Sequence, residues 1–301
     1  MMDLRCFRYG TIVIISLFFL VCSRPGISHS KDNFIIGLIP EMNVFKQQQR
    51  FQPLADYLSE KIGVKVELSM LSRYGNIVQR LKEAKVDAAF LGSFTGALAI
   101  SQLGVEPLVR PINLNGTSTY HGHIFVRKDS GIQTFEEMRG KTMVFVERAT
   151  TAGYIFPLAY IKRHGVTDYT TFFNEYFFSG SHDAAVDAVF KGQADIGAAK
   201  NTIFDFYMEK NPKAKDEIVI LASSPNVPSN GLCVIPTLDK ELKYKIKNAL
   251  LELDTNPKGA SVLKKLRAIR FVETRKEDYL PVTVLSSEAE ISLKEYQYIN
   301  R

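Results

Sequence analysis

The chain has 301 residues, of which 46% are hydrophobic and 23% are charged, and this balance excludes an extensively disordered protein. The formal net charge of +6 is modest. Because basic and acidic residues are interspersed and no nucleic-acid-binding motif occurs, the charge does not indicate a nucleic-acid partner. The length is typical of two domains of moderate size.

The first 30 residues have the pattern of a secretion signal. Arg5 and Arg8 precede an apolar run over 11–21, which is too short to span a membrane. We therefore expect residues 1–30 to be a signal peptide and the mature protein to be periplasmic or otherwise extracytoplasmic, peripheral to the membrane. Cys22 could carry a lipid anchor, but Val21 is a poor match for the small residue expected before such a cysteine, which favours a soluble form. Cys233 is then the single cysteine left, so no internal disulfide is expected.

From residue 34 onward, short apolar strands alternate with amphipathic helices, which predicts an α/β fold. The alternation begins afresh after residue 131, and the turn-rich segment 223–231 is typical of a strand that crosses back between domains. We predict that residues 31–127 and 226–301 form lobe 1 and that residues 128–225 form lobe 2. A ligand cleft between the two lobes, with two hinge strands near Lys128 and Pro225, is the expected consequence. After two predicted helices, 240–253 and 260–266, the tail to residue 301 has weak periodicity.

The strand predicted at 143–146 leads into small and hydroxylated residues that open a helix, among them Thr150 and Thr151. The first turn of a helix has backbone N–H groups without intrahelical acceptors and a partial positive charge, so this position suits an oxyanion. The plainer interpretation is that the two threonines only cap the helix.

Other hydrogen-bond donors also follow strands or begin helices: Tyr74, Ser93, Tyr120 and His182. In open α/β sheets the ligand crevice lies beyond the carboxyl ends of the strands, where several of these residues are expected. No nucleophile elbow, phosphate-binding loop or dinucleotide fingerprint occurs, so we expect no catalytic residues and no cofactor. His121 and His123 share one face of a predicted strand, but they lack a third ligand nearby in sequence, so a metal site is not favoured.

Seven segments in fixed order resemble the periplasmic phosphate/phosphite/phosphonate-binding proteins of ABC importers. They are GLIP (37–40), RFQPLADYLSEKIGVKVEL (50–68), the turn at Tyr74, VDAAFLGSFTGALA (86–99), YHGHIFVRKDSGI with FEEMRGK (120–141), ERATTAGYIFP (147–157) and SGSHDAAVDAVFKGQADIG (179–197). The resemblance implies a two-lobed type II periplasmic-binding-protein fold. It also implies that a phosphorus oxyanion is held at positions that correspond to Tyr74, Tyr120, Thr150, Thr151, Ala152 and His182.

The chain departs from this family pattern in two ways. Ala152 stands where many relatives have a serine, which removes one hydroxyl donor. Asn201 or Thr202, together with Asn230, stand where relatives that bind aminoalkylphosphonates have carboxylates. A buried ammonium group without a counter-charge is costly, so the neutral residues disfavour a zwitterionic aminophosphonate.

The resemblance implies a solute-binding protein that captures phosphate, phosphite or a small alkylphosphonate and delivers it to an ABC permease. The alternative is a sensing subunit that uses the same fold to signal to a membrane partner without transport. An exported enzyme is a third class, and no catalytic pattern in the sequence supports it.

Overall fold

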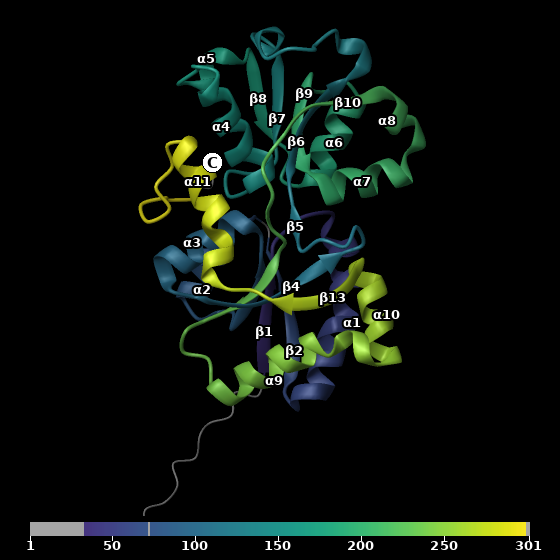
Figure 1. The fold of residues 1–301 in the computed structure, drawn as a ribbon, viewed down its shortest axis with the longest axis vertical. Coiled ribbons are helices and arrows are strands. Elements are labelled where there is room, and N and C mark those ends of the chain that lie inside the picture. Colours follow the sequence, from purple (N-terminus) through teal and green to yellow (C-terminus); the bar gives the residue numbers. More distant parts are fainter. Residues whose placement is uncertain (1–32, 72, 299–301) are drawn as a thin grey trace, which may run out of the picture. The chain divides into compact units, whose positions relative to one another are not determined.

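The computed structural model describes residues 33–71 and 73–298, so the predicted signal peptide and Cys22 lie outside the described residues. Within these ranges the chain forms two larger sheets that are connected by a two-stranded ribbon (Figure 1). None of the described helices combines the length and the apolar character that crossing a membrane would require.

The first sheet has six strands in the order β13-β4-β12-β3-β1-β2. The pairs β1–β2 and β1–β3 are parallel and the other pairs are antiparallel, so this sheet is mixed. Its strands are β1 (Asn33–Leu38), β2 (Lys65–Met70), β3 (Ala88–Leu91), β4 (Glu106–Asn113), β12 (Gly231–Val234) and β13 (Ala268–Glu273). The helices that follow these strands in the chain are α1 (Val44–Ile62), α2 (Asn76–Lys82), α3 (Ser93–Leu103), α9 (Lys240–Leu251) and α10 (Pro257–Leu266).

The second sheet has five strands in the order β10-β6-β9-β7-β8. These are β6 (Gly122–Arg127), β7 (Thr142–Phe145), β8 (Glu175–Phe178), β9 (Ile196–Lys200) and β10 (Ile218–Ser223). Its helices are α4 (Phe156–Arg163), α5 (Tyr169–Phe172), α6 (His182–Phe190), α7 (Asn201–Lys210) and α8 (Pro212–Glu217). A π-helical turn, η3 (Thr151–Ile155), leads directly into α4.

The two sheets are linked by β5 (Thr119–Tyr120) and β11 (Val227–Pro228), which pair antiparallel. The sequence prediction placed the first crossing near Lys128, with residues 122–127 in lobe 1. In the structure β6 pairs with β9 and β10, so the chain has already entered the second sheet at Gly122. The sequence over 120–127 favoured a single strand, but its two parts belong to β5 of the ribbon and to β6 of the second sheet, so the boundary between them was not predicted.

Helix α1 shows how local sequence fixes an element. The side chain of Asn43 accepts the N–H groups of Phe45 and Lys46 at its start, and Gly63 ends it in the left-handed conformation with φ of 71°. Its apolar face includes Phe51 and Leu54 and packs, with residues of α9 and α10, against one face of the first sheet. A second apolar cluster includes residues next to both sheets, so the core continues across the ribbon.

The tail after α10 is more regular than its sequence indicated. It forms β13, the short helix η5 (Lys276–Tyr279) and helix α11 (Leu280–Glu288), which packs against α3 and α4. Ile269, Leu280 and Val284 are exposed, so apolar residues do not mark one buried face, and the periodicity is weak.

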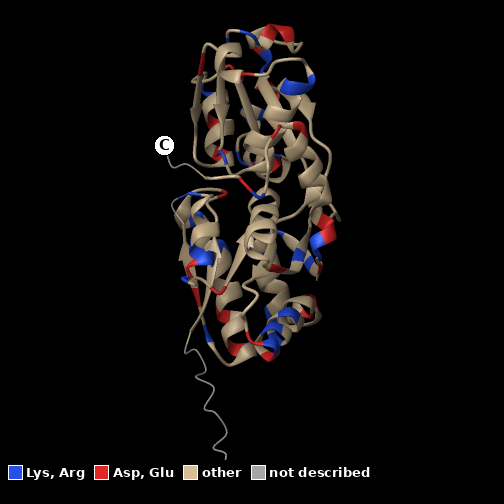
Figure 2. Ribbon diagram, turned by 90° about the vertical axis from the view of Figure 1, so that its left-hand side faces the viewer, with Lys and Arg blue, Asp and Glu red and all other residues tan. Residues whose placement is uncertain are grey.

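Several lysines of α9 have acidic partners. Lys243, Lys245 and Lys247 form ion pairs with Glu106, Glu241 and Glu273, respectively. Figure 2 shows blue and red segments interspersed along the chain. Interspersed charges of both signs are typical of a solvated surface rather than of a membrane-binding patch.

Candidate functional site

Three helices begin at one small cavity between the two sheets. Helix α3 follows β3 and begins at Ser93, the turn η3 follows β7 and begins at Thr151, and α6 follows β8 and begins at His182. The residues lining the cavity are Ile39, Glu41, Tyr74, Gly92, Ser93, Phe94, Tyr120, Ala149, Thr150, Thr151, His182, Lys200 and Asn230. Three helix N-termini bring backbone N–H groups and partial positive charge to a single point.

The start of η3 is held tightly against the strand before it. A Cβ atom at Gly153 would lie 2.4 Å from the Cβ of Val146, so only glycine permits this close packing. Thr150 is the N-cap residue, but its hydroxyl donates to the carbonyl of Glu147 at 2.6 Å and makes no capping bond to an N–H group of η3, unlike the bond that the capping interpretation expected. Thr151 makes no such local bond, and its side chain points toward α3.

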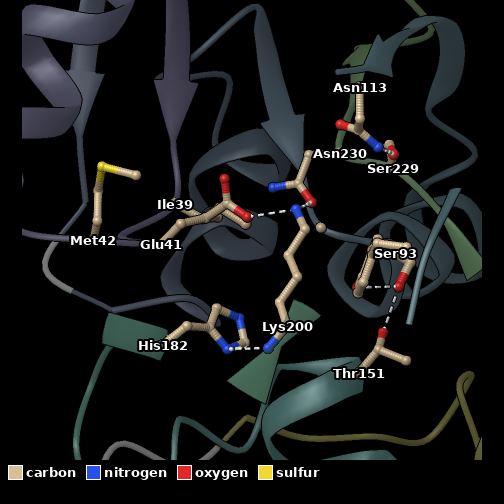
Figure 3. Close-up of polar contacts among 12 residues, drawn as sticks. Ile39, Glu41, Met42, Ser93, Asn113, Thr151, His182, Lys200, Ser229 and Asn230 are labelled. Carbon is tan, nitrogen blue, oxygen red and sulfur yellow. Dashed lines mark hydrogen bonds and ion pairs between the residues drawn. The ribbon is translucent and has the colours of Figure 1, made fainter. Parts of the chain in front are cut away.

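Hydroxyl groups from three elements meet at the cavity. The Thr151 Oγ1 atom lies 2.5 Å from Ser93 Oγ, which lies 2.7 Å from the Tyr120 hydroxyl (Figure 3). All three residues are buried, and they belong to η3, α3 and β5. These hydrogen bonds therefore connect α3, which follows β3 of the first sheet, with η3, which follows β7 of the second sheet, and with β5 of the ribbon.

Tyr74 and His182 supply two further donors. The Tyr74 hydroxyl is buried and has no hydrogen-bond partner in the described part of the chain, and burial raises its pKa well above the ordinary value. The ring of His182 meets the Tyr74 ring edge-on, with centroids 6.2 Å apart. Burial lowers the pKa of His182 to about 3, so the imidazole is neutral at physiological pH. Its Nδ1 atom accepts the backbone N–H of Lys200 at 3.1 Å, which leaves the ring proton on Nε2 as a donor.

Two charged residues at the cavity were missed from the sequence. Lys200 Nζ donates to Glu41 Oε1 at 2.8 Å and to Asn230 Oδ1 at 2.9 Å, and it lies 4.5 Å from the centre of the Tyr120 ring (Figure 3). Burial alone would raise the pKa of Glu41, but the nearby cations Lys200 and Arg50 together lower it, so the carboxylate is charged. Glu41 follows shortly after β1 and Lys200 ends β9, and this position beyond strand ends was the signal that could have identified them.

The structure brings most of the predicted site residues together, but not all. Ala152 and Asn201 do not line the cavity. The Cα atom of Ala152 lies 2.9 Å from where a Cβ atom at Gly122 would be, so Ala152 packs against β6. The Asn201 side chain accepts the N–H of His121 at 3.1 Å, beside the crossing strand. Asn230 does line the cavity, as predicted, but the expectation of a site without a carboxylate differs from the structure, because Glu41 is present.

His121, His123 and Cys233 are the remaining candidates from the sequence. The rings of His121 and His123 are 4.7 Å apart, and within residues 33–71 and 73–298 no group of three or more His, Cys, Asp or Glu side chains could hold a metal ion. Cys233 is buried in β12, and burial raises the pKa of its thiol to about 12. A thiol with that pKa is not a reactive nucleophile.

Comparisons with known proteins identify the family of the chain. A family model described as an ABC transporter, phosphonate, periplasmic substrate-binding protein matches residues 36–279. The chain is 25% identical over 238 residues to the phosphate-import protein PhnD of Mycolicibacterium smegmatis, covering 76% of this chain and 74% of that protein. It is 23% identical over 277 residues to the probable ABC transporter phosphite binding protein PhnD1 of Prochlorococcus marinus, covering 89% and 93%.

Solved structures show the same fold. The binding-protein component of an ABC phosphonate transporter of Pseudomonas aeruginosa has a TM-score of 0.80 at 21% identity, over 86% of each chain. The structure of Prochlorococcus marinus PhnD1 in complex with methylphosphonate has a TM-score of 0.77 at 19% identity, over 86% of this chain and 98% of that one. The predicted type II periplasmic-binding-protein fold is confirmed. The chain belongs to the family of periplasmic substrate-binding proteins of phosphonate ABC transporters, which confirms the prediction of a solute-binding protein rather than an enzyme.

Proposed function

We propose that this protein captures a small phosphorus oxyanion, namely phosphate, phosphite or a small alkylphosphonate, and delivers it to the membrane subunits of an ABC permease. The observation that carries this proposal is the convergence of α3, η3 with α4, and α6 on one cavity. Three helix N-termini favour an anion without requiring an unpaired cationic side chain. The names of the relatives, which import phosphate or bind phosphite and methylphosphonate, support the same ligand class.

The donors at the cavity suit a tetrahedral oxyanion. Ser93, Tyr74, Thr151 and His182 Nε2 each offer one O–H or N–H group, and the first turn of η3 adds backbone N–H groups. Hydrogen bonds to a charged acceptor are stronger than those between neutral groups. The cavity measures about 10 Å³, which is about the space of one water molecule. An oxyanion therefore requires the Ser93–Thr151 contact to open, after which its oxygens replace that hydrogen bond.

Opening of this contact suggests how the ligand enters. Ser93 follows the first sheet and Thr151 follows the second, and β5 and β11 are the strands that connect the two sheets. We propose that the two lobes, divided at this ribbon, separate about it to admit the anion and close when the anion bridges both sides. We also propose that the protein is exported by cleavage within residues 1–30. The product is then soluble and is not acylated at Cys22.

Calorimetry on the exported protein with phosphate, phosphite and methylphosphonate tests the proposal. We expect binding of at least one of the three anions, and Thr151→Val should weaken it by about 10- to 100-fold, since a hydrogen bond to a charged group contributes about 1.5–3 kcal/mol. Thr283→Val, at an exposed position of α11, is the matched control and should retain the affinity of the natural protein. Equal affinity of the Thr151 and Thr283 variants would contradict the assigned site.

A further inference from the structure

Three side chains form a wall between two spaces. Glu41, Lys200 and Asn230 line the anion cavity, and the same three residues line a larger pocket of about 380 Å³. The larger pocket continues toward apolar residues such as Phe51, Phe90 and Phe271 and is therefore roomy enough for an organic substituent. The Lys200 ammonium holds this wall together, because it donates to both other members.

The wall already contains a positive charge, which is the ammonium group of Lys200. The side chains of Glu41 and Lys200 are each only 8% exposed, so the carboxylate has little water to compensate its charge. Removal of one partner from a buried ion pair leaves an uncompensated charge. The surroundings of the Lys200 ammonium, a carboxylate, an amide oxygen and the face of the Tyr120 ring, are the groups that bind an alkylammonium ion in general.

We infer that Lys200 is a specificity-determining residue whose ammonium group fills the place that an amino substituent of a ligand would occupy. This inference rests on the proposed function. The side chain of Lys200 both neutralises Glu41 and closes the anion cavity off from the larger pocket. The site consequently selects phosphorus oxyanions with no substituent or a small uncharged one, and it rejects those that carry an ammonium group.

Truncation of Lys200 should reverse the selectivity. Lys200→Ala removes the ammonium group and most of the side chain, joins the two spaces and leaves Glu41 and Asn230 free to receive a cation from the ligand. 2-Aminoethylphosphonate, which carries a phosphonate and an ammonium group separated by two carbons, is a suitable probe. Methylphosphonate has the same phosphonate group without the cation and is the reference ligand.

The experiment measures, by calorimetry, the ratio of the Kd for 2-aminoethylphosphonate to the Kd for methylphosphonate. A ratio is used because Lys200 lines the cavity, and its loss can weaken both ligands. We expect this ratio to exceed 10 for the natural protein and to fall at least tenfold in Lys200→Ala. In Lys200→Met, which fills similar space without charge, and in the double variant Glu41→Gln/Lys200→Ala, the ratio should remain at least tenfold above that of Lys200→Ala.

Several results would overturn the inference. One is a natural protein that binds the two phosphonates equally well, and this test needs no variant. Another is an unchanged ratio in Lys200→Ala, or the same fall in Lys200→Met as in Lys200→Ala. Circular dichroism and the Tm of each variant establish that it is folded. The double variant leaves no unpaired buried carboxylate, so loss of the ion pair should not prevent it from folding. A natural protein that binds no phosphorus oxyanion would instead contradict the proposed function.

Discussion

His182 begins α6, and its two ring nitrogens have different roles. Nδ1 accepts the backbone N–H of Lys200, so the neutral ring keeps its proton on Nε2, where it can be donated to a ligand at the cavity. A protonated ring would lose the bond to Lys200, because Nδ1 would then be a donor. The neutral form of this single residue is therefore needed both for the folded structure and for the proposed anion site.

This role predicts a dependence of stability on pH. Burial lowers the pKa of His182 to about 3 in the folded protein, whereas the ordinary value of about 6.5 applies in the unfolded chain. The unfolded chain thus binds a proton that the folded one does not, and stability that is present above pH 6.5 is lost as the pH falls toward 3. The slope for one such group is at most about 1.4 kcal/mol per pH unit.

Urea unfolding at a series of pH values checks this expectation with His182→Asn, whose side-chain oxygen can replace Nδ1 as the acceptor. Between pH 6 and pH 4 the free energy of unfolding should fall less steeply in the variant, by about 1 kcal/mol per pH unit. Other titrating groups, including His123 with its pKa lowered to about 4 by burial, are common to both proteins and cancel. Parallel pH profiles would show that His182 is not the group responsible.

At the scale of elements, the C-terminal segment after α11 contacts both α3, which follows the first sheet, and the loop before η3, which follows a strand of the second sheet. The Tyr296 ring packs edge-on against Phe94 of α3, with centroids 5.2 Å apart, and its hydroxyl donates to the carbonyl of Arg148 at 2.9 Å. Gln102 of α3 donates to the carbonyls of Leu293 and Tyr296. The segment therefore supports the starts of both α3 and η3, two of the three helices at the cavity.

Tyr296→Ala tests the contribution of this segment. Loss of the half-buried ring and its hydrogen bond should lower the free energy of unfolding by about 2 kcal/mol. Tyr244→Ala is the matched control, because the Tyr244 side chain in α9 is 66% exposed, and surface substitutions of this kind change stability by about 0.5 kcal/mol at most. Denaturant unfolding of both variants would give the difference, and an equal effect would mean that the tail contributes nothing.

At the scale of the whole molecule, the sequence predicted the helices and strands that depend on neighbouring residues. The apolar run at 143–146 and the small residues after it form β7 and η3, and the helix beginning at His182 forms α6 with Ser181 as its cap. The donors at these helix starts also proved to share one cavity, because strand ends in an α/β sheet gather at one edge.

Features that depend on distant parts of the chain were not predicted. Glu41 and Lys200 are 159 residues apart, and each by itself is indistinguishable from a solvated surface charge. The crossing at Gly122 falls inside the single strand that the sequence predicted around His121 and His123, so the hydrophobic pattern did not locate it. Helix α11 has apolar residues on its exposed side, which obscured its period.

A crystal structure of the exported protein with methylphosphonate tests most directly whether the three helix starts form the anion site. Phosphonate oxygens should lie within about 3.2 Å of Ser93 Oγ, Thr151 Oγ1 and His182 Nε2, since this is the range of a hydrogen bond. Lys200 should still be paired with Glu41. A phosphonate bound away from the starts of α3, η3 and α6, for example only in the larger pocket near Arg267, would contradict the assignment.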